Sequence, residues 1–244
     1  MFAVIYGFLF SQISQATVIV HSLNEQKVGL HTTLGAKYAE SSSTVSKKDY
    51  DADFRLSHNN DLRQWLLFGN LGYSAVNGNK SEDSKLIHLR YIHKNLVSDL
   101  NFEGFVQHES DDFALLSSRE LVGAGLALLK KTDDYAFHTM LGIMHEQESN
   151  LTDSSQDKQL ERMTFSSQLQ WYFVNKAQFT SVIYYQPAID EIKNYRATLK
   201  ANYKMPINNT VDLVIGYSWQ YNNNAFTNVP AVKRSFSTGI SYHF

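Results

Sequence analysis

The alternation of apolar and polar residues is the feature that most constrains the fold of this chain. From residue 27 onward it has a period of two, in segments separated by clusters of Asn, Asp, Ser, Gly and Lys. In the last segment, Phe236, Thr238, Ile240, Tyr242 and Phe244 share one face, and small or polar residues fall between them. Successive side chains of a strand point to opposite faces, so the pattern predicts strands with one apolar face. Helical periodicity is weak, and we therefore expect an all-β protein.

Twelve such segments follow one another along the chain. We expect strands near residues 27–39, 50–58, 63–76, 84–93, 97–107, 119–129, 135–147, 162–173, 177–186, 195–205, 210–222 and 233–244. An even number of segments, each about ten residues long, is typical of bacterial outer-membrane barrels. The predicted fold class is thus a transmembrane, antiparallel, up-and-down β-barrel of about 12 strands.

The expected connections alternate between long and short. The long ones are residues 40–49, 77–83, 108–118, 148–161, 187–194 and 223–232. The short ones are residues 59–61, 94–96, 130–134, 174–176 and 206–209. Outer-membrane barrels carry short turns on the periplasmic side and longer loops on the cell surface. We therefore expect a cell outer membrane location in a Gram-negative bacterium, with both termini in the periplasm.

Aromatic residues lie close to the ends of the expected strands, where membrane proteins place their interfacial girdles. They are Tyr38, Trp65, Tyr73, Tyr91, Trp171, Phe173, Tyr195, Tyr203, Trp219, Tyr221, Tyr242 and Phe244. A soluble β-sandwich or lipocalin-like barrel would also alternate, but it has no need of aromatics at strand ends. The aromatic positions favour the membrane barrel.

The first residues resemble a secretory signal segment. Residues 1–10 are apolar, and residues 11–16 (SQISQA) resemble a small-residue cleavage site, although no Lys or Arg precedes Lys27. We expect a signal peptide at 1–16, a short periplasmic segment at 17–26 and the barrel at 27–244. A buried strand at residues 1–10 is the alternative. No apolar run is long enough for a membrane-spanning helix, and the absence of cysteine excludes disulfides and thiolate metal sites.

Charged residues mostly share the polar phase, as expected where a cation facing lipid at mid-depth costs about 2 to 4 kcal/mol. The basic residues of that phase are Lys27, Lys37, Arg55, Arg90, Arg119, Arg162, Arg196, Lys200, Lys204 and Lys233. The acidic ones are Asp51, Asp53, Glu103, Glu146 and Asp212. The third and ninth strands stay unassigned, because Leu66, Phe68, Val182 and Tyr184 put apolar groups on both faces.

Other kinds of site have weak support in the sequence. The inward-phase histidines (His31, His88, His138 and His243) lie on four strands without metal-ligand spacing, so we expect no metal and no cofactor. Basic and acidic residues are mixed along the whole chain, so we expect no nucleic-acid partner. The acidic stretch Glu146 to Glu161, with Glu148, Asp153 and Asp157, could bind divalent cations at the cell surface, but it is more simply a solvated loop. We expect no enzyme, since no G-x-S-x-G elbow occurs. A lipid-acting enzyme stays open only if a Ser and a His meet on the lipid face.

Several short motifs, taken in order, resemble the family of salt-induced outer membrane proteins, also catalogued as domain of unknown function 481. They are Gly69 to Asn79 (GNLGYSAVNGN), Arg90-Tyr91, Arg119 with Gly123-Ala124-Gly125, Asn194-Tyr195-Arg196, and Tyr242-His243-Phe244. The resemblance covers roughly residues 27–244 and implies an outer-membrane barrel without an established activity. Tyr242 and Phe244 also resemble the C-terminal signal of barrel-assembly substrates, so we expect that machinery and outer-membrane lipids as partners.

Two functions follow from the expected interior. The excess of basic groups favours a narrow pore for small solutes with weak anion preference, since rings of Arg and Lys favour anions. Its expected lining residues are Arg55, Arg90, Glu103, Arg119, Arg196, Lys200, Lys204 and Asp212. Long side chains can also fill a barrel of this size. The alternative is a non-conducting structural or surface-interaction barrel linked to osmotic or salt stress. The solute is unknown.

Overall fold

The computed structural model of this chain describes residues 28–42, 46–174, 176–208 and 210–242. The expected signal peptide and the segment 17–26 lie outside the described residues, as do Lys27, His243 and Phe244. The strands are β1 (Gly29–Ser42), β2 (Ser46–Asn59), β3 (Arg63–Val76), β4 (Asn79–Val97), β5 (Leu100–Asp111), β6 (Leu116–Lys131), β7 (Tyr135–Asn150), β8 (Lys158–Tyr172), β9 (Gln178–Pro187), β10 (Tyr195–Pro206), β11 (Val211–Asn222) and β12 (Val232–Tyr242). Two 3₁₀ turns, η1 (Asp112–Ala114) and η2 (Ser154–Gln156), interrupt the connections. Within the described ranges, no helix is long and apolar enough to span a bilayer.

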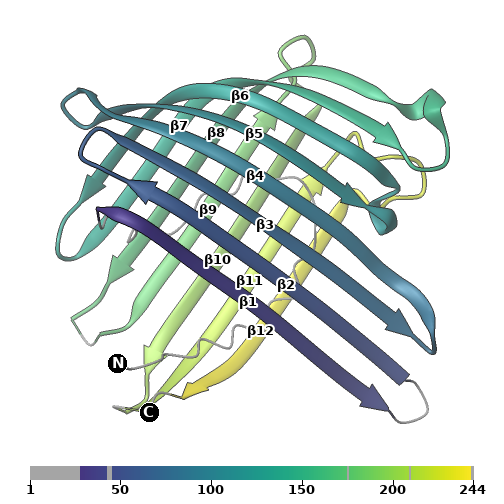
Figure 1. The fold of residues 1–244 in the computed structure, drawn as a ribbon, viewed down its shortest axis with the longest axis horizontal. Coiled ribbons are helices and arrows are strands. Elements are labelled where there is room, and N and C mark those ends of the chain that lie inside the picture. The colour runs from purple at the N-terminus through teal and green to yellow at the C-terminus, as the bar shows by residue number, and fades with distance from the viewer. Residues whose placement is uncertain (1–27, 43–45, 175, 209, 243–244) are drawn as a thin grey trace.

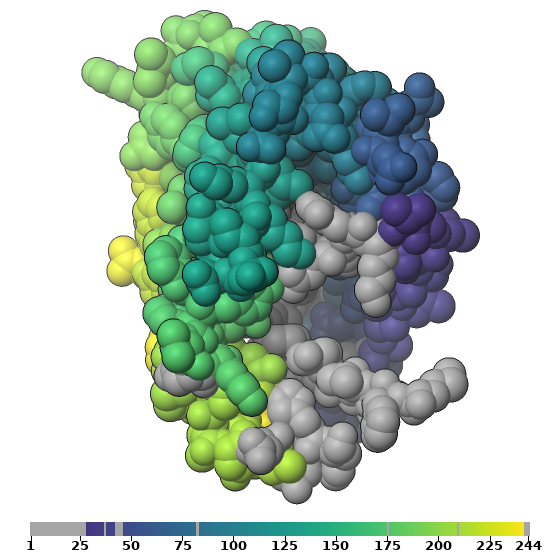
Figure 2. All heavy atoms as spheres, turned by 90° about the vertical axis from the view of Figure 1, so that its left-hand side faces the viewer, coloured from purple at the N-terminus to yellow at the C-terminus, as the bar shows by residue number. Residues whose placement is uncertain are grey.

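All twelve strands form one antiparallel sheet in which each strand pairs with its neighbours in the sequence, from β1 to β12. The sheet curls into a barrel (Figure 1). Seen along the barrel, its wall passes from purple through blue, teal and green to yellow (Figure 2). The predicted fold class, strand number and strand order are confirmed. No ladder joins β1 to β12 among the described residues, so these two are the edges of the sheet.

The connections divide the barrel ends into two rims. One end, here called the loop rim, carries the connections that follow β1, β3, β5, β7, β9 and β11. The other end, the turn rim, carries those that follow β2, β4, β6, β8 and β10. The long loops predicted at 40–49 and 77–83 are wrong, because β1, β2 and β4 extend into them. Asn77 and Gly78 form a tight hairpin turn with φ of 51° and 78°. Such Asn-Gly pairs suit turns that need two left-handed residues.

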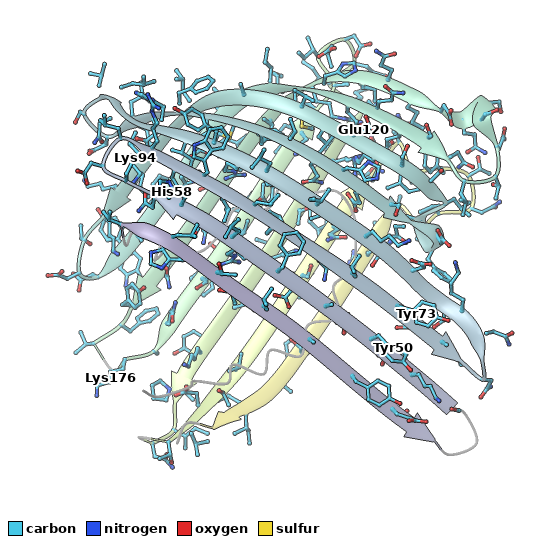
Figure 3. The ribbon with its side chains drawn as sticks, viewed as in Figure 1. Tyr50, His58, Tyr73, Lys94, Glu120 and Lys176 are labelled. Atoms are coloured by element: carbon cyan, nitrogen blue, oxygen red, sulfur yellow. The ribbon has the colours of Figure 1, made fainter. Side chains whose placement is uncertain are left out.

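The outward surface is apolar between two aromatic girdles. Near the loop rim, the rings of Tyr38 and Tyr50 are 5.0 Å apart and those of Tyr50 and Tyr73 are 6.0 Å apart. Near the turn rim, Trp65 lies 4.6 Å from the ring of Tyr91. Figure 3 shows Tyr50 and Tyr73 together at one end of the barrel, opposite Lys94 and Lys176 at the turn rim. Large apolar side chains are exposed between the girdles, and they include Leu71, Ile87, Val106, Val122, Leu126, Leu128, Leu141 and Ile183.

The spacing of the girdles fits a bilayer. Trp65 and Tyr73 are eight residues apart on β3, as are Tyr195 and Tyr203 on β10. Eight residues of strand span about 27 Å, and a tilt of about 40° reduces this to a height of about 20 Å, close to the apolar band of outer-membrane barrels. The girdle positions predicted from the sequence therefore agree with a membrane-spanning barrel.

The two strands left unassigned have a clear facing in the structure. On β3, Leu66 and Phe68 are buried while Trp65 is exposed. On β9, Tyr184 is buried and Val182 packs with the buried cluster, while Ile183 is exposed. These inward apolar groups belong to an apolar layer inside the barrel.

Candidate functional site in the barrel interior

Six charged side chains form one ion-pair network inside the barrel near the loop rim. This loop-rim cluster contains Glu109, Arg119, Glu146, Glu148, Arg162 and Arg196, from strands β5, β6, β7, β8 and β10. Glu146 lies at its centre. Its carboxylate accepts from Arg119 Nη2 at 2.8 Å, from Arg162 Nε at 2.9 Å and from Arg196 Nη1 at 3.0 Å. Three guanidinium groups therefore share one carboxylate.

The other two carboxylates balance the remaining charge of the loop-rim cluster. Glu148 accepts from Arg196 Nη2 at 2.8 Å and lies 3.3 Å from Arg119 Nε. Glu109 lies 3.9 Å from Arg119 Nη1. Three carboxylates thus face three guanidinium groups, and the cluster has no formal net charge. The exposed fractions of these side chains are between 0% and 7%.

Arg162 also ties the cluster to the β9–β10 connection. Its Nη1 donates to the backbone carbonyl of Gln186 at 3.0 Å, and its Nη2 donates to Oδ1 of Asn194 at 3.2 Å. Its side chain has no exposed surface. Arg162 therefore orders a loop as well as neutralising Glu146.

An apolar layer lies below the loop-rim cluster. It contains Phe105, Leu121, Ala127, Met140, Met144 and Tyr184, with Val182 packed against it. Gly123 makes room for this layer, because a Cβ there would lie 2.4 Å from Phe105 Cζ and 2.8 Å from Met144 Cβ. The absence of a side chain at Gly123 thus leaves space for larger interior side chains.

A second polar group, the turn-rim cluster, adjoins the apolar layer, and its Gln107 Nε2 donates to Glu109 of the loop-rim cluster at 3.4 Å. It contains His88, Arg90, Glu103, Gln107 and His138, all buried. Glu103 contacts His138 Nε2 at 2.6 Å and Arg90 Nη1 at 3.4 Å, and His88 Nδ1 lies 3.0 Å from Gln107 Oε1. Two of the four inward histidines therefore join the same cluster. No group of three or more potential metal ligands occurs among the described residues.

The β11–β12 loop covers the loop-rim cluster. Phe226 from this loop is buried against Ala114 and Leu116, which lie at the β5–β6 connection. A cavity of about 30 Å³ remains beneath it, lined by Arg119, Glu148 and Arg196 together with loop residues. The side chains of the loop-rim cluster and of the β11–β12 loop thus close the part of the interior that lies between β5 and β11.

The opposite part of the wall is less filled. Inward residues of β4 to β8 are mostly buried, whereas Arg55, Lys200, Asn202 and Ser218 are only half-buried and Asp53 is exposed. Lys204 Nζ pairs with Asp212 at 2.8 Å. The inward neighbours of Lys200 on the adjacent strands are Val182 and Ser218. Its charge interacts with Glu109 of the loop-rim cluster, but no ion pair of Lys200 is found within the described ranges. Arg55, Lys200 and Lys204 therefore belong to the less filled side.

The interior contains acidic residues that sequence reasoning missed. Asp49, Glu109, Asp111 and Glu148 face inward, because β2, β5 and β7 extend into the segments assigned to loops. Among the lining residues expected for a pore, Arg119 and Arg196 join the loop-rim cluster, and Arg90 and Glu103 join the turn-rim cluster. The alternation of Glu109 with Gln107, and of Glu148 with Glu146, was the available signal.

The outward face carries two imidazole–carboxylate pairs near the loop rim. His145 Nδ1 lies 2.6 Å from Glu161 Oε1, and His108 Nδ1 lies 3.6 Å from Glu120 Oε1. Neither histidine hydrogen-bonds a serine among the described residues. The geometry required for a lipid-acting serine enzyme is therefore not found at these two histidines.

The family model described as "Protein of unknown function, DUF481" matches residues 32–244. The chain belongs to this family. The resemblance noted in the short motifs is thus confirmed over most of the chain. Among curated proteins, no sequence matches this DUF481 protein.

Several solved outer-membrane proteins are similar in structure to the DUF481 protein. The NanC porin is 10% identical with a TM-score of 0.48, and the match covers 87% of this chain and 99% of that one. The KdgM porin, in complex with disordered oligogalacturonate, is 12% identical with a TM-score of 0.44, covering 88% and 99%. The translocator domain of the autotransporter NalP from Neisseria meningitidis is 11% identical with a TM-score of 0.42, covering 91% of each chain. The apolar belt and girdles of the DUF481 protein identify it as an outer-membrane β-barrel.

Proposed function

We propose that this DUF481 protein is a narrow pore for small solutes with a weak preference for anions. The observation that carries the proposal is the uneven filling of the interior. Most inward side chains of β4 to β8 are packed and excluded from solvent. On β10 and β2 the partly exposed inward residues are Lys200, Asn202, Lys204, Asp51, Asp53 and Arg55. A route along that side would be lined by polar and charged groups, as channels through barrels are.

The proposed anion preference rests on few groups. The arginines of the loop-rim cluster are neutralised by three carboxylates, so they add little to selectivity. The less filled side has four basic residues, Arg55, Lys200, Lys204 and Lys233, and three acidic residues, Asp51, Asp53 and Asp212. Lys200 contributes most, because Lys204 is paired with Asp212. A small excess of positive charge supports a weak preference.

The test is single-channel conductance in a planar bilayer under a salt gradient, after heat-dependent gel migration and β-type circular dichroism confirm folding. We expect small conductance steps and a reversal potential biased toward anions. Lys200→Gln should abolish the bias, and Lys200→Glu should reverse it. Lys85→Gln is the matched control, since Lys85 lies on the outward face with 62% of its side chain exposed. A folded barrel that never conducts would contradict the proposal.

A non-conducting structural or surface-interaction barrel, linked to osmotic or salt stress, is the second candidate. The fully buried loop-rim cluster and the loop above it favour this reading, because they fill the barrel with fixed side chains. The same bilayer recording separates the two functions.

We also propose that the turn rim and both chain termini face the periplasm, and that Tyr242 and Phe244 act in barrel assembly. The short turns support this orientation. A protease site inserted at Leu151–Asp157, between β7 and β8, should be cut in intact cells, whereas one inserted at 132–134 should be cut only after the outer membrane is opened. The reverse pattern would overturn the orientation.

A further inference from the structure

The β11–β12 loop reaches across the mouth of the barrel at the loop rim. It leaves the wall after Asn222 and returns at Val232. Phe226 nevertheless packs on Ala114 and Leu116 at the β5–β6 connection, although β7 to β10 separate β6 from β11 in the sheet. In Figure 1 the yellow loop lies beside the connections of the green and teal strands. The loop therefore forms a strap across the opening.

The far end of this strap is held by the β7–β8 connection. The backbone N–H of Thr227 donates to Gln156 Oε1 at 2.9 Å. Lys158 Nζ lies 4.4 Å above the ring of Phe226 and donates to the backbone carbonyl of Asn224. A cation over an aromatic face is an attractive contact. One aromatic ring and a few polar contacts thus fasten the strap to the opposite wall.

The strap lies directly above the loop-rim cluster. The small cavity between them is lined by Arg119, Glu148 and Arg196 from below and by Phe226 and Val229 from above. Within the strap, a tight turn joins the carbonyl of Phe226 to the N–H of Val229 at 3.0 Å, with Asn228 at a φ of 69°. The turn holds the ring of Phe226 toward the barrel wall, where this ring is the apolar part of a fastening that also includes Gln156 and Lys158.

We propose that residues 223–231 are the gate of the pore and that Phe226 is its latch. The gate is closed when Phe226 lies against Ala114 and Leu116, and it opens when the strap swings back toward β11 and β12. Lids of this kind move as loops between two positions and control access to what lies beneath. This inference rests on the proposed pore function and adds the element that controls it.

The chain has no cysteine, so the strap can be tied down at a chosen point. The variant Gln156→Cys/Thr227→Cys is treated with a short bis-methanethiosulfonate linker, which dithiothreitol removes. The matched control is Ser46→Cys/Asn77→Cys, which joins two neighbouring hairpins at the same rim, where the N–H of Asn77 donates to the Ser46 carbonyl at 2.7 Å. We expect linkage at 156–227 to abolish conductance and reduction to restore it, while linkage at 46–77 leaves conductance unchanged.

A second variant tests the latch without a linker. Phe226→Ala should raise the open fraction roughly tenfold, since the ring is the main apolar contact of the strap. If wild-type protein conducts but neither linkage at 156–227 nor Phe226→Ala changes conductance, the proposed gate is wrong and the proposed pore is supported. Failure of the 156–227 linker to react would also overturn the gate. If no variant conducts, reduced or linked, the pore itself fails.

Discussion

Glu146 Oε1 lies 2.9 Å from Arg162 Nε, and neither side chain has any exposed surface. Glu146 also accepts from Arg119 and Arg196, so this one carboxylate contacts three buried guanidinium groups. A buried ion pair contributes little over an apolar replacement, but removal of one partner leaves an uncompensated charge. The integrity of the barrel near the loop rim should therefore depend on Glu146.

Glu146→Gln is expected to lower the free energy of unfolding by about 3 to 5 kcal/mol, because the arginines lose their shared counter-charge. The measurement is denaturant unfolding in lipid vesicles, followed by tryptophan fluorescence and gel migration. Glu161→Gln is the control, since Glu161 pairs with His145 on the outward face with 62% of its side chain exposed. It should change stability by less than about 1 kcal/mol. If the two variants lost equal amounts of stability, the buried network would contribute no more than an exposed pair.

Gly123 should not tolerate a side chain. In Gly123→Ala the new Cβ would meet Phe105 and Met144 at less than van der Waals distance, and overpacking of this kind costs about 1 to 3 kcal/mol. Gly104→Ala is the matched control on the neighbouring strand, because its nearest atoms would be 3.8 Å away. Combining Gly123→Ala with Phe105→Leu should recover part of the loss. Unfolding curves of the three variants test this, and an additive double variant would contradict the stated cause.

Leu126 on β6 should contact lipid. It is 49% exposed and lies on the same outward face as Val122 and Leu128. Leu126→Arg is expected to destabilise the barrel by about 2 to 4 kcal/mol, the cost of an arginine near the bilayer midplane. Leu151→Arg, at a 44% exposed position in the β7–β8 loop, should have a much smaller effect. If the two variants unfold alike, the assigned membrane position is wrong.

The strand pattern could be predicted where lipid imposes it. Between the girdles, one face must be apolar, so the alternation of Phe236 and Ile240 with serines and glycine is visible in the sequence. Near the loop rim this constraint ends. Glu120 and Glu161 face outward there, so both faces of the strands are polar. The alternation therefore no longer shows where the strands end. That is why Glu109 and Glu148 were assigned to loops.

The alternation of apolar and polar residues does not show which inward residues contact one another in the loop-rim cluster. The inward phase of Arg119 and Arg196 was predicted, but their common partner was not, because pairing across several strands depends on register and barrel curvature. Leu66 and Tyr184 show the same limit, since inward apolar residues break the polar phase without a local signal. The hairpin at Asn77-Gly78 was predictable from its two residues, whose left-handed φ angles suit a two-residue turn.

Asp153 should make the strap sensitive to acid. Its carboxylate accepts from the backbone N–H of Ser155 at 3.0 Å and from Gln156 Nε2 at 3.0 Å, and Gln156 in turn accepts from Thr227 of the strap. Hydrogen bonds from Ser155 and Gln156 hold the pKa of Asp153 below its ordinary value. A carboxyl group with a lowered folded pKa stabilises the fold above its unfolded pKa and loses that contribution as the pH falls through the folded value.

We therefore expect Asp153→Ala at neutral pH to increase hydrogen exchange at Thr227 severalfold, because the side chain of Gln156 is no longer held. Wild-type protein should show the same loosening only when the pH falls through the lowered pKa of Asp153, once intrinsic exchange rates are corrected for pH. Thr210 is the internal reference, since its N–H donates to Asn208 at the opposite rim. Unchanged exchange at Thr227 in Asp153→Ala would show that Gln156 holds the strap without help from Asp153.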